Sequence, residues 1–235
     1  RVQTSGKWHC GFRQKPFSPT GELELSGEKI FINTGAQATM PNVTGLTTTP
    51  GVFDSTGLLN LTHRPERLGI LGGGYIGVEF ASMFANFGSK VTIYEAAPQF
   101  LAREDRDIAE AIANILRDKG VEIILNARVQ AVSSHDGEVQ VQMPEGAQTV
   151  DALLVASGRK PATENLQLQN AGVDVNEHGA IVVNKYLRTS ADNIWAMGDV
   201  TGGLQFTYIS LDDFRIVRDN LLGEGLRHTG DRQNI

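Results

Sequence analysis

The sequence predicts an α/β protein: a Rossmann-like, doubly wound domain with a parallel sheet and an antiparallel β-meander, and part of a second α/β domain. Three observations support this prediction. Strands and helices alternate between residues 67 and 125, and the first strand runs into a glycine-rich turn. Three strand-like runs follow without a helix, and a later apolar strand ends in Gly198-Asp199 before another helix. Alternating strands and helices imply a parallel sheet with right-handed crossovers.

Composition excludes several functional classes. Of the 235 residues, 40% are hydrophobic and 20% are charged, which is typical of a globular protein of one large or two smaller domains. The net charge of −6 argues against nucleic acid or an anionic membrane as a partner. Cys10 is the only cysteine of the sequence, so no disulfide or CxxC zinc site can form within it, and we expect no metal site. No apolar run approaches the ~20 residues that span a bilayer, and we expect a cytoplasmic protein.

The first 66 residues are expected to hold little regular structure. Residues 22–25 alternate polar and apolar side chains and predict a short strand. Residues 29–34 predict a buried strand that ends at Gly35. Residues 36–66 are rich in Thr, Pro and Gly, which favours a linker or an irregular surface segment.

The central segment has the order β-α-β-α-β. The expected elements are a strand at 67–71, a helix at 75–87, a strand at 90–94, a helix at 105–119 and a strand at 121–125. Apolar residues at helical spacing predict a buried face on each helix. These residues are Ile76, Phe80, Met83, Phe84 and Phe87 in the first helix and Ile108, Ile112, Ile115 and Leu116 in the second. Gly88 and Gly120 are expected to end the two helices.

The later elements are shorter. The three runs of the expected meander are 128–133, 138–143 and 149–156. Residues 157–192 predict loops with a short strand at 181–183, and a buried strand at 193–197 and a helix at 210–222 follow.

The strongest local motif is Gly72-Gly73-Gly74-Tyr75-Ile76-Gly77, which fits G-x-G-x-x-G between a strand and a helix. The first glycine permits a tight turn, the second lets a pyrophosphate approach the backbone, and the last lets the helix pack close to the strand. The helix N-terminus offers N–H groups and a positive dipole end to phosphates. A glycine-rich turn without a ligand is the alternative, but the flanking β-α-β order favours nucleotide binding.

Two glutamates accompany this motif. Glu95 follows the second strand, 18 residues beyond Gly77, where a carboxylate accepts ribose hydroxyls and repels a 2′-phosphate. Residues 96–101 contain no arginine for such a phosphate, so NADH is preferred over NADPH. A solvated strand end is the alternative for Glu95. Glu79 lies two residues beyond Gly77 and is either an exposed helix residue or a group beside the cofactor.

Three further strand-to-glycine junctions are weak signals individually, because a simple turn explains each of them. They are Thr34-Gly35, Ser157-Gly158-Arg159 and Gly198-Asp199. Asp199 could accept hydrogen bonds from a sugar-like chain at a strand end. A helix beginning near Tyr208–Ser210 would point its N–H groups at the same place.

The order of four sequence blocks resembles the pyridine nucleotide-disulfide oxidoreductases. These FAD-dependent flavoproteins include dihydrolipoamide dehydrogenase, glutathione reductase and mercuric reductase. The blocks are INTGAQATMP, LGILGGGYIGVEFASMFANFGSKVTIYE, ALLVASGRKPAT and NIWAMGDVTGGLQFTYIS. In the family they correspond to the crossover into the NAD domain, the NAD fingerprint, the return crossover and the second FAD signature.

The resemblance implies a role for each matching residue. The NAD site would contain Gly72, Gly74, Tyr75, Ile76, Gly77, Glu95 and Gly158. The FAD site would contain Thr34, Gly35, Arg159, Gly198, Asp199, Tyr208 and Ser210. Glu79 would be a catalytic residue near the nicotinamide and the flavin, where family members pair it with a lysine. The helix that starts near Ser210 would face the pyrimidine edge of the flavin and stabilise negative charge there.

The chain also departs from the family pattern. It lacks the first FAD-binding G-x-G-x-x-G, the C-x4-C redox pair and the interface domain with its His-Glu pair, which His228 does not replace. Residues 1–15 do not match the segment that family members have before the first crossover. We therefore expect a middle fragment: residues 1–35 from the first part of an FAD domain, 36–158 as the NAD domain, and 159–235 from the second part of the FAD domain.

The function implied by the resemblance is transfer of hydride from NADH to FAD and on to a disulfide or other acceptor. The longer parent protein would be a homodimer. Two alternatives stay open: a nucleotide-binding module without turnover of its own, and the same flavoprotein acting on a metal ion such as Hg(II) or Cu(II).

Overall fold

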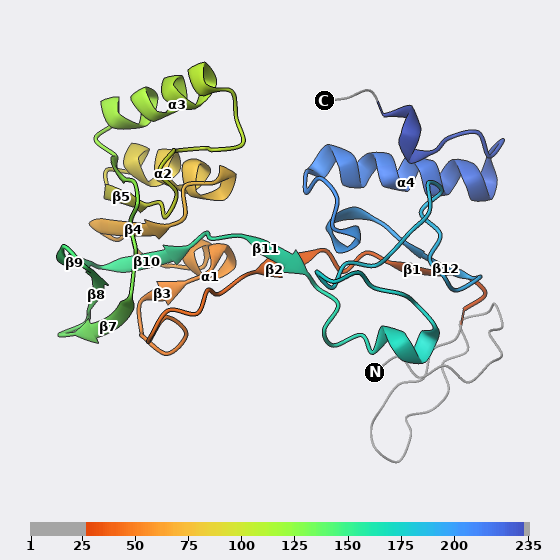
Figure 1. Ribbon diagram of the computed structural model, residues 1–235, viewed down its shortest axis with the longest axis horizontal. Coiled ribbons are helices and arrows are strands. Elements are labelled where there is room, and N and C mark those ends of the chain that lie inside the picture. Colours follow the sequence, from red (N-terminus) through yellow and green to blue (C-terminus); the bar gives the residue numbers. More distant parts are fainter. Residues whose placement is uncertain (1–26, 233–235) are drawn as a thin grey trace, which may run out of the picture. The chain divides into compact units, whose positions relative to one another are not determined.

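The computed structural model describes residues 27–232, which form two compact units (Figure 1). One unit is the continuous segment Ala38–Arg159. The other combines the chain up to Gln37 with the chain from Lys160 onward. Cys10 and the strand expected at 22–25 lie outside the described residues.

A five-stranded parallel sheet forms the centre of the Ala38–Arg159 unit. In sheet order its strands are β3 (Val52–Phe53), β10 (Ala152–Val155), β4 (Arg67–Leu71), β5 (Lys90–Tyr94) and β6 (Glu122–Ile124). Every pairing within it is parallel. The helices of the unit are α1 (Ser55–Leu59), α2 (Tyr75–Asn86) and α3 (Arg106–Asp118). The order β4-α2-β5-α3-β6 confirms the predicted α/β fold with a parallel sheet.

An antiparallel meander belongs to the same unit. Its strands are β7 (Ala131–His135), β8 (Glu138–Met143) and β9 (Gly146–Val150). Asp136 and Gly137 connect the first two strands with φ angles of 51° and 83°. Two consecutive positive φ angles are what a two-residue hairpin turn requires, and Asp-Gly adopts them readily.

Side chains alternate between the two faces of the parallel sheet. Ile70 and Ile93 pack with the helices in one buried cluster. Their neighbours Leu71 and Tyr94 pack with the meander in a second cluster. Because successive strand residues point to opposite faces, the helices and the meander cover opposite sides of the sheet (Figure 1).

The prediction of which residues the two helices bury is partly wrong. On α3 the buried side chains are Ala109, Ala113 and Leu116, whereas Ile108 and Ile115 are exposed. On α2, Phe80 and Phe84 are buried, but Phe87 is exposed. Helical spacing identifies an apolar stripe but does not fix the rotation of the helix, and α3 turns its small alanines toward the sheet.

Three expectations for strands are also wrong. The run 149–156 forms two strands, because β9 closes the meander and β10 enters the parallel sheet between β3 and β4. Segment 36–66 contains β2 (Ala36–Ala38), β3 and α1 rather than only irregular chain. Asp54 caps α1 by accepting the Gly57 N–H at 2.7 Å. The strand expected at 181–183 is reduced to an isolated bridge between Val175 and Ile181.

An ion-paired cluster joins the parallel sheet to the meander. The Asp151 carboxylate lies between β9 and β10 and accepts the Arg67 backbone N–H at 2.7 Å. It also accepts the Arg67 guanidinium, which bonds Glu138 of β8 at 2.6 Å. Partial burial raises the pKa of Asp151, but the hydrogen bonds from Arg67 outweigh it and hold this pKa below its usual range.

Replacing Asp151 with asparagine should lower stability at neutral pH and have little effect in strong acid. A carboxyl with a lowered pKa stabilises the fold above its unfolded pKa of about 4, and this contribution is lost as pH falls through the folded pKa. Thermal unfolding of wild type and D151N between pH 2 and 7 measures the difference. The control is D136N, at the exposed tip of the hairpin. A difference between wild type and D151N of equal size at both ends of this range would contradict the assignment.

The second unit is built around a pair of parallel strands. β1 (Ile30–Ile32) pairs with β12 (Ile194–Ala196). Alternate residues Trp195 and Met197 pack with Ile216 of α4 (Thr207–Leu222), which begins three residues earlier than expected. Short 3-10 turns lie at η1 (Leu168–Ala171), η2 (Gly198–Thr201) and η3 (Thr229–Asp231). β2 pairs with β11 (Arg159–Pro161) where the chain passes between the units.

Candidate cofactor-binding sites

The glycine-rich turn has the geometry expected of a nucleotide site. It connects the carboxyl end of β4 to the start of α2. Gly72 has φ +110°, and a Cβ there would lie 2.5 Å from the Ala156 carbonyl oxygen. A Cβ on Gly77 would lie 2.2 Å from the Gly72 carbonyl oxygen. Neither position accommodates a side chain, so the turn is tight and α2 packs directly against it.

Gly74 differs from these two glycines. It is the N-cap residue of α2, and a Cβ built on it would meet no atom within 4 Å. As a glycine it supplies no side-chain cap for this helix end, and the N–H groups of a first helical turn have no partner within the helix. Open space beside an uncapped helix N-terminus fits a pyrophosphate, which needs close backbone approach and N–H donors.

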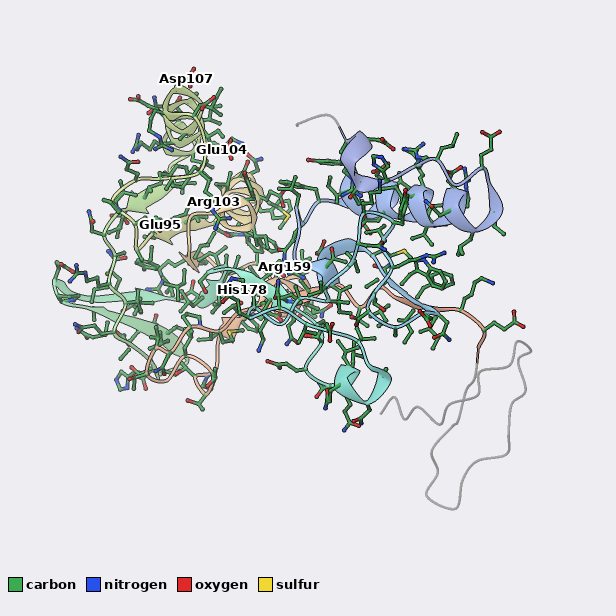
Figure 2. The ribbon with its side chains drawn as sticks, turned by 45° about the vertical axis from the view of Figure 1, so that its right-hand side comes forward. Glu95, Arg103, Glu104, Asp107, Arg159 and His178 are labelled. Carbon is green, nitrogen blue, oxygen red and sulfur yellow. The ribbon has the colours of Figure 1, made fainter. Side chains whose placement is uncertain are left out.

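Glu95 lies directly beside the turn (Figure 2). It follows the last residue of β5, and its Oε2 accepts the Gly73 N–H at 2.7 Å. Its Oε1 accepts the Ala97 N–H at 2.7 Å. Each carboxylate oxygen has a second lone pair that can accept a ribose hydroxyl. The two backbone bonds therefore hold the carboxylate at the carboxyl edge of the sheet, where the sequence predicted the adenosine ribose.

The segment after β5 contributes contacts that the sequence did not reveal. Tyr75 is 51% exposed, and its hydroxyl donates to the Glu104 carboxylate. The Arg106 guanidinium donates to the carbonyls of Phe100 and Glu104, which fixes the segment between them. Figure 2 labels Arg103 and Glu104 on this segment. Tyr75 and Glu104 are 29 positions apart, so no local pattern could have indicated the pair.

The other predicted residues of this site are Ile76, Glu79 and Gly158, and their surroundings differ. Ile76 packs against the helical core cluster, so its contribution to a ligand would come from its backbone. Glu79 is exposed on α2. Gly158 follows β10, has φ +131° and faces open space, while its carbonyl accepts the Thr39 N–H at 2.9 Å. Because β10 is the sheet neighbour of β4, Gly158 lies near the same carboxyl edge as the glycine turn.

In the second unit, the turn after β12 is crowded against its neighbours. Gly198 has φ +72°, and a Cβ there would lie 2.9 Å from Asn33 Oδ1 and 3.0 Å from Ser210 Oγ. Asp199 is the next residue and is half-buried. The structure thus brings Gly198 and Ser210 together and adds Asn33, which the sequence did not indicate.

The start of α4 completes this region. Its N-cap residue, Phe206, makes no side-chain cap bond, so the first turn of the helix offers N–H donors near the Gly198-Asp199 turn. Tyr208 is 45% exposed and stacks on Phe206, with ring centroids 5.4 Å apart. A carboxylate beside an uncapped helix N-terminus fits the polyhydroxyl chain and polar ring edge of a flavin nucleotide.

Thr34 and Gly35 directly precede β2, and Arg159 begins β11, the strand that pairs with β2. The Thr34 hydroxyl donates to the Ala162 carbonyl at 2.9 Å, and the Ala162 N–H donates to the Gly35 carbonyl at 2.9 Å. Gly35 has φ +70° and faces open space. Arg159 begins β11 and is half-buried. The bonds to Ala162 fix the backbone of Thr34-Gly35.

Comparison with known proteins decides the family. A model of the pyridine nucleotide-disulphide oxidoreductase family matches residues 6–213. The chain belongs to this family. The resemblance carried by the four sequence blocks is thereby confirmed, and so is the α/β fold class.

Individual family members share much of this chain. It is 71% identical, over 217 residues, to the "Probable pyridine nucleotide-disulfide oxidoreductase RclA" of Escherichia coli K12, with 92% of this chain and 49% of the relative covered. It is 36% identical to a mercuric reductase of Bacillus cereus, with coverage of 85% and 32%. A solved Cu(II) complex of the HOCl-induced flavoprotein disulfide reductase RclA from E. coli superposes with a TM-score of 0.88 at 69% identity, covering 91% of this chain and 50% of that one. The chain thus spans about half the length of its E. coli relative.

Within residues 27–232, none of the helices of this family member has the length and apolar character needed to cross a bilayer.

Proposed function

We propose that this chain supplies the NADH site and part of the FAD site of a flavoprotein reductase. The whole protein would transfer hydride from NADH to FAD and then reduce a disulfide or another acceptor. The observation that carries the proposal is the open, uncapped start of α2 at Gly74, with the Glu95 carboxylate bound to the adjacent Gly73 N–H. This combination offers N–H donors to a pyrophosphate and an acceptor to a ribose.

The residues of the Ala38–Arg159 unit would bind and orient the nicotinamide cofactor. Gly72 and Gly77 shape the turn, and Gly74 leaves room for the pyrophosphate. Glu95 would accept the ribose hydroxyls and disfavour a 2′-phosphate, which gives NADH preference over NADPH. Tyr75 and Gly158 would border the nicotinamide. Glu79, exposed on α2, would act beside the nicotinamide as the catalytic residue.

The second unit would bind FAD, whose isoalloxazine accepts the hydride when it is bound. Asp199 would bind the ribityl chain, and the start of α4 would place N–H donors at the pyrimidine edge. The other residues of this site would be Thr34, Gly35, Arg159, Gly198, Tyr208 and Ser210. We assign residues 1–35 and 159–235 to this FAD domain and residues 36–158 to the NAD domain.

Further proposals concern the whole protein. A homodimer in the cytoplasm, with no nucleic-acid or membrane partner, fits the family and the acidic composition. A metal ion is the second candidate for the acceptor, because relatives include a mercuric reductase and a flavoprotein solved with Cu(II). Such an ion would be a substrate of the whole protein rather than a resident cofactor.

The visible absorption spectrum of the purified chain, recorded with added FAD and then NADH, tests the proposal. We expect a protein-bound flavin band that bleaches with NADH, which would establish both sites and hydride transfer between them. Saturable NADH binding without bound flavin would instead support a nucleotide-binding module without turnover. No binding of either cofactor would refute the proposal.

A further inference from the structure

Helix α4 carries a buried carboxylate, Asp213. Asp213 is 2% exposed and is the only carboxylate among residues 27–232 that is this deeply buried. It was not a predicted site residue. Burying a charge is unfavourable unless hydrogen bonds and a counter-charge compensate for it. The hydrogen-bond partners of Asp213 therefore indicate the role of this buried carboxylate.

The two carboxylate oxygens of Asp213 have different partners. Oδ2 accepts the backbone N–H of Gly198 at 2.7 Å. Oδ1 accepts Nη2 of Arg232, which lies in the segment after α4. The neighbouring Asp212 accepts Nε of the same arginine at 2.8 Å, and it also binds Arg227 at 3.0 Å. Asp213 thus connects the Gly198 turn to the segment that follows α4, whereas Asp212 contacts only that segment through these bonds.

The Gly198 turn must keep one particular backbone conformation to fit between its neighbours, and Asp213 helps to hold it there. Gly198 has a left-handed φ of +72°, with Asn33 and Ser210 close to the position of a Cβ. The Thr201 hydroxyl donates to the Gly198 carbonyl at 2.9 Å, so both backbone polar groups of Gly198 are hydrogen-bonded. Charge-assisted hydrogen bonds are about twice as strong as neutral ones. Asp213 therefore fixes the Met197–Gly198 peptide, one residue before Asp199.

We propose that Asp213 is a positioning residue for FAD: it holds the Gly198-Asp199 turn in the shape that binds the flavin nucleotide, with Arg232 as its counter-ion. This inference rests on the proposed FAD site at Asp199. Asp213 does not touch the cofactor and acts through the Gly198 N–H. Arg232 prevents the buried carboxylate from adding an uncompensated negative charge behind this site.

The charge state of Arg232 agrees with this arrangement. Partial burial works against its charge, but hydrogen bonds to Asp212 and Asp213 outweigh burial and raise the pKa of Arg232. The guanidinium therefore stays protonated and keeps both carboxylates paired. The segment that carries Arg232 is further tied to α4, because Asp219 accepts the N–H groups of Leu226 and Arg227 at 2.9 Å each.

Three substitutions in the 235-residue chain test the proposal. D213A removes the acceptor for the Gly198 N–H, whereas D213N keeps an amide oxygen there and loses the acceptor for Arg232. D212A is the matched control, since it removes the adjacent carboxylate and its bonds to Arg232 without touching the turn. The measurements are FAD affinity, from the quenching of flavin fluorescence, and hydrogen exchange of the peptide containing residues 197–202 in the absence of FAD. Circular dichroism shows that each variant is folded.

We expect D213A to weaken FAD binding about 10- to 100-fold, as for loss of a buried charge-assisted hydrogen bond. D213A should also speed hydrogen exchange at residues 197–202. D213N should bind FAD more tightly than D213A but more weakly than wild type, because it keeps an acceptor for the Gly198 N–H and loses the ion pair with Arg232. D212A should stay within about 3-fold of wild type. Equal affinity and exchange in D213A and D212A would overturn the inference.

The outcomes separate this inference from the proposed function. Wild type that binds FAD, with an unaffected D213A, contradicts the role of Asp213 and leaves the FAD site intact. Wild type that binds no FAD overturns the FAD site and with it the effect on cofactor affinity. In that case the exchange measurement still decides whether Asp213 holds the turn.

Discussion

Replacing Gly77 with alanine should abolish NADH binding and destabilise the Ala38–Arg159 unit. The new Cβ would lie 2.2 Å from the Gly72 carbonyl oxygen, which is backbone and cannot rotate away. α2 would have to move off the turn, at a cost of about 2 kcal/mol or more, as for overpacked cores. Thermal unfolding and NADH titration by fluorescence measure the two effects.

Gly74 provides a matched comparison on the same turn. Its Cβ would meet open space, and its φ of −78° suits alanine. G74A should therefore change stability by less than about 1 kcal/mol, the cost of alanine at an N-cap. It should still weaken NADH binding about 10-fold or more, because the methyl group fills the space assigned to the pyrophosphate. If G74A bound NADH as tightly as wild type, the pyrophosphate would not lie at this turn.

Replacing Glu95 with alanine should weaken NADH binding about 10-fold and reduce the preference over NADPH by a similar factor. The first effect follows from loss of a charged acceptor for the ribose, for which about 1.5 kcal/mol is typical. The second follows from loss of the charge that repels a 2′-phosphate. Dissociation constants for both cofactors give the ratio.

Two further variants separate charge from structure at this position. E95Q keeps the shape of the side chain and removes its charge, so it should reduce the preference for NADH, although its amide oxygen can accept only one of the Gly73 and Ala97 N–H groups. E122Q is the control, because Glu122 starts the adjacent strand β6 and lies toward the opposite edge of the sheet. An unchanged ratio of NADH to NADPH affinity in E95A would refute the ribose assignment.

Some site residues could be predicted because their signals are local in sequence. The glycine turn needs only its spacing and the flanking strand and helix to be found. Glu95 follows from its position after the next strand. Tyr75–Glu104 and Gly198–Asp213 could not be found this way, since each joins residues whose spacing matches no motif. Their pairing depends on how loops and helices pack after the chain has folded.

The same division holds for the fold. The sequence alone determined the β-α-β-α-β order, the meander and the glycine turn, because hydrophobic period and glycine placement act over a few residues. Only the tertiary structure decided that β10 lies between β3 and β4 and that α3 buries Ala109 rather than Ile108. It also decided that Asp213 lies beneath the Gly198 turn. Strand partners, helix rotation and buried ion pairs are fixed by contacts between distant segments, whose free energies exist only once the core is packed.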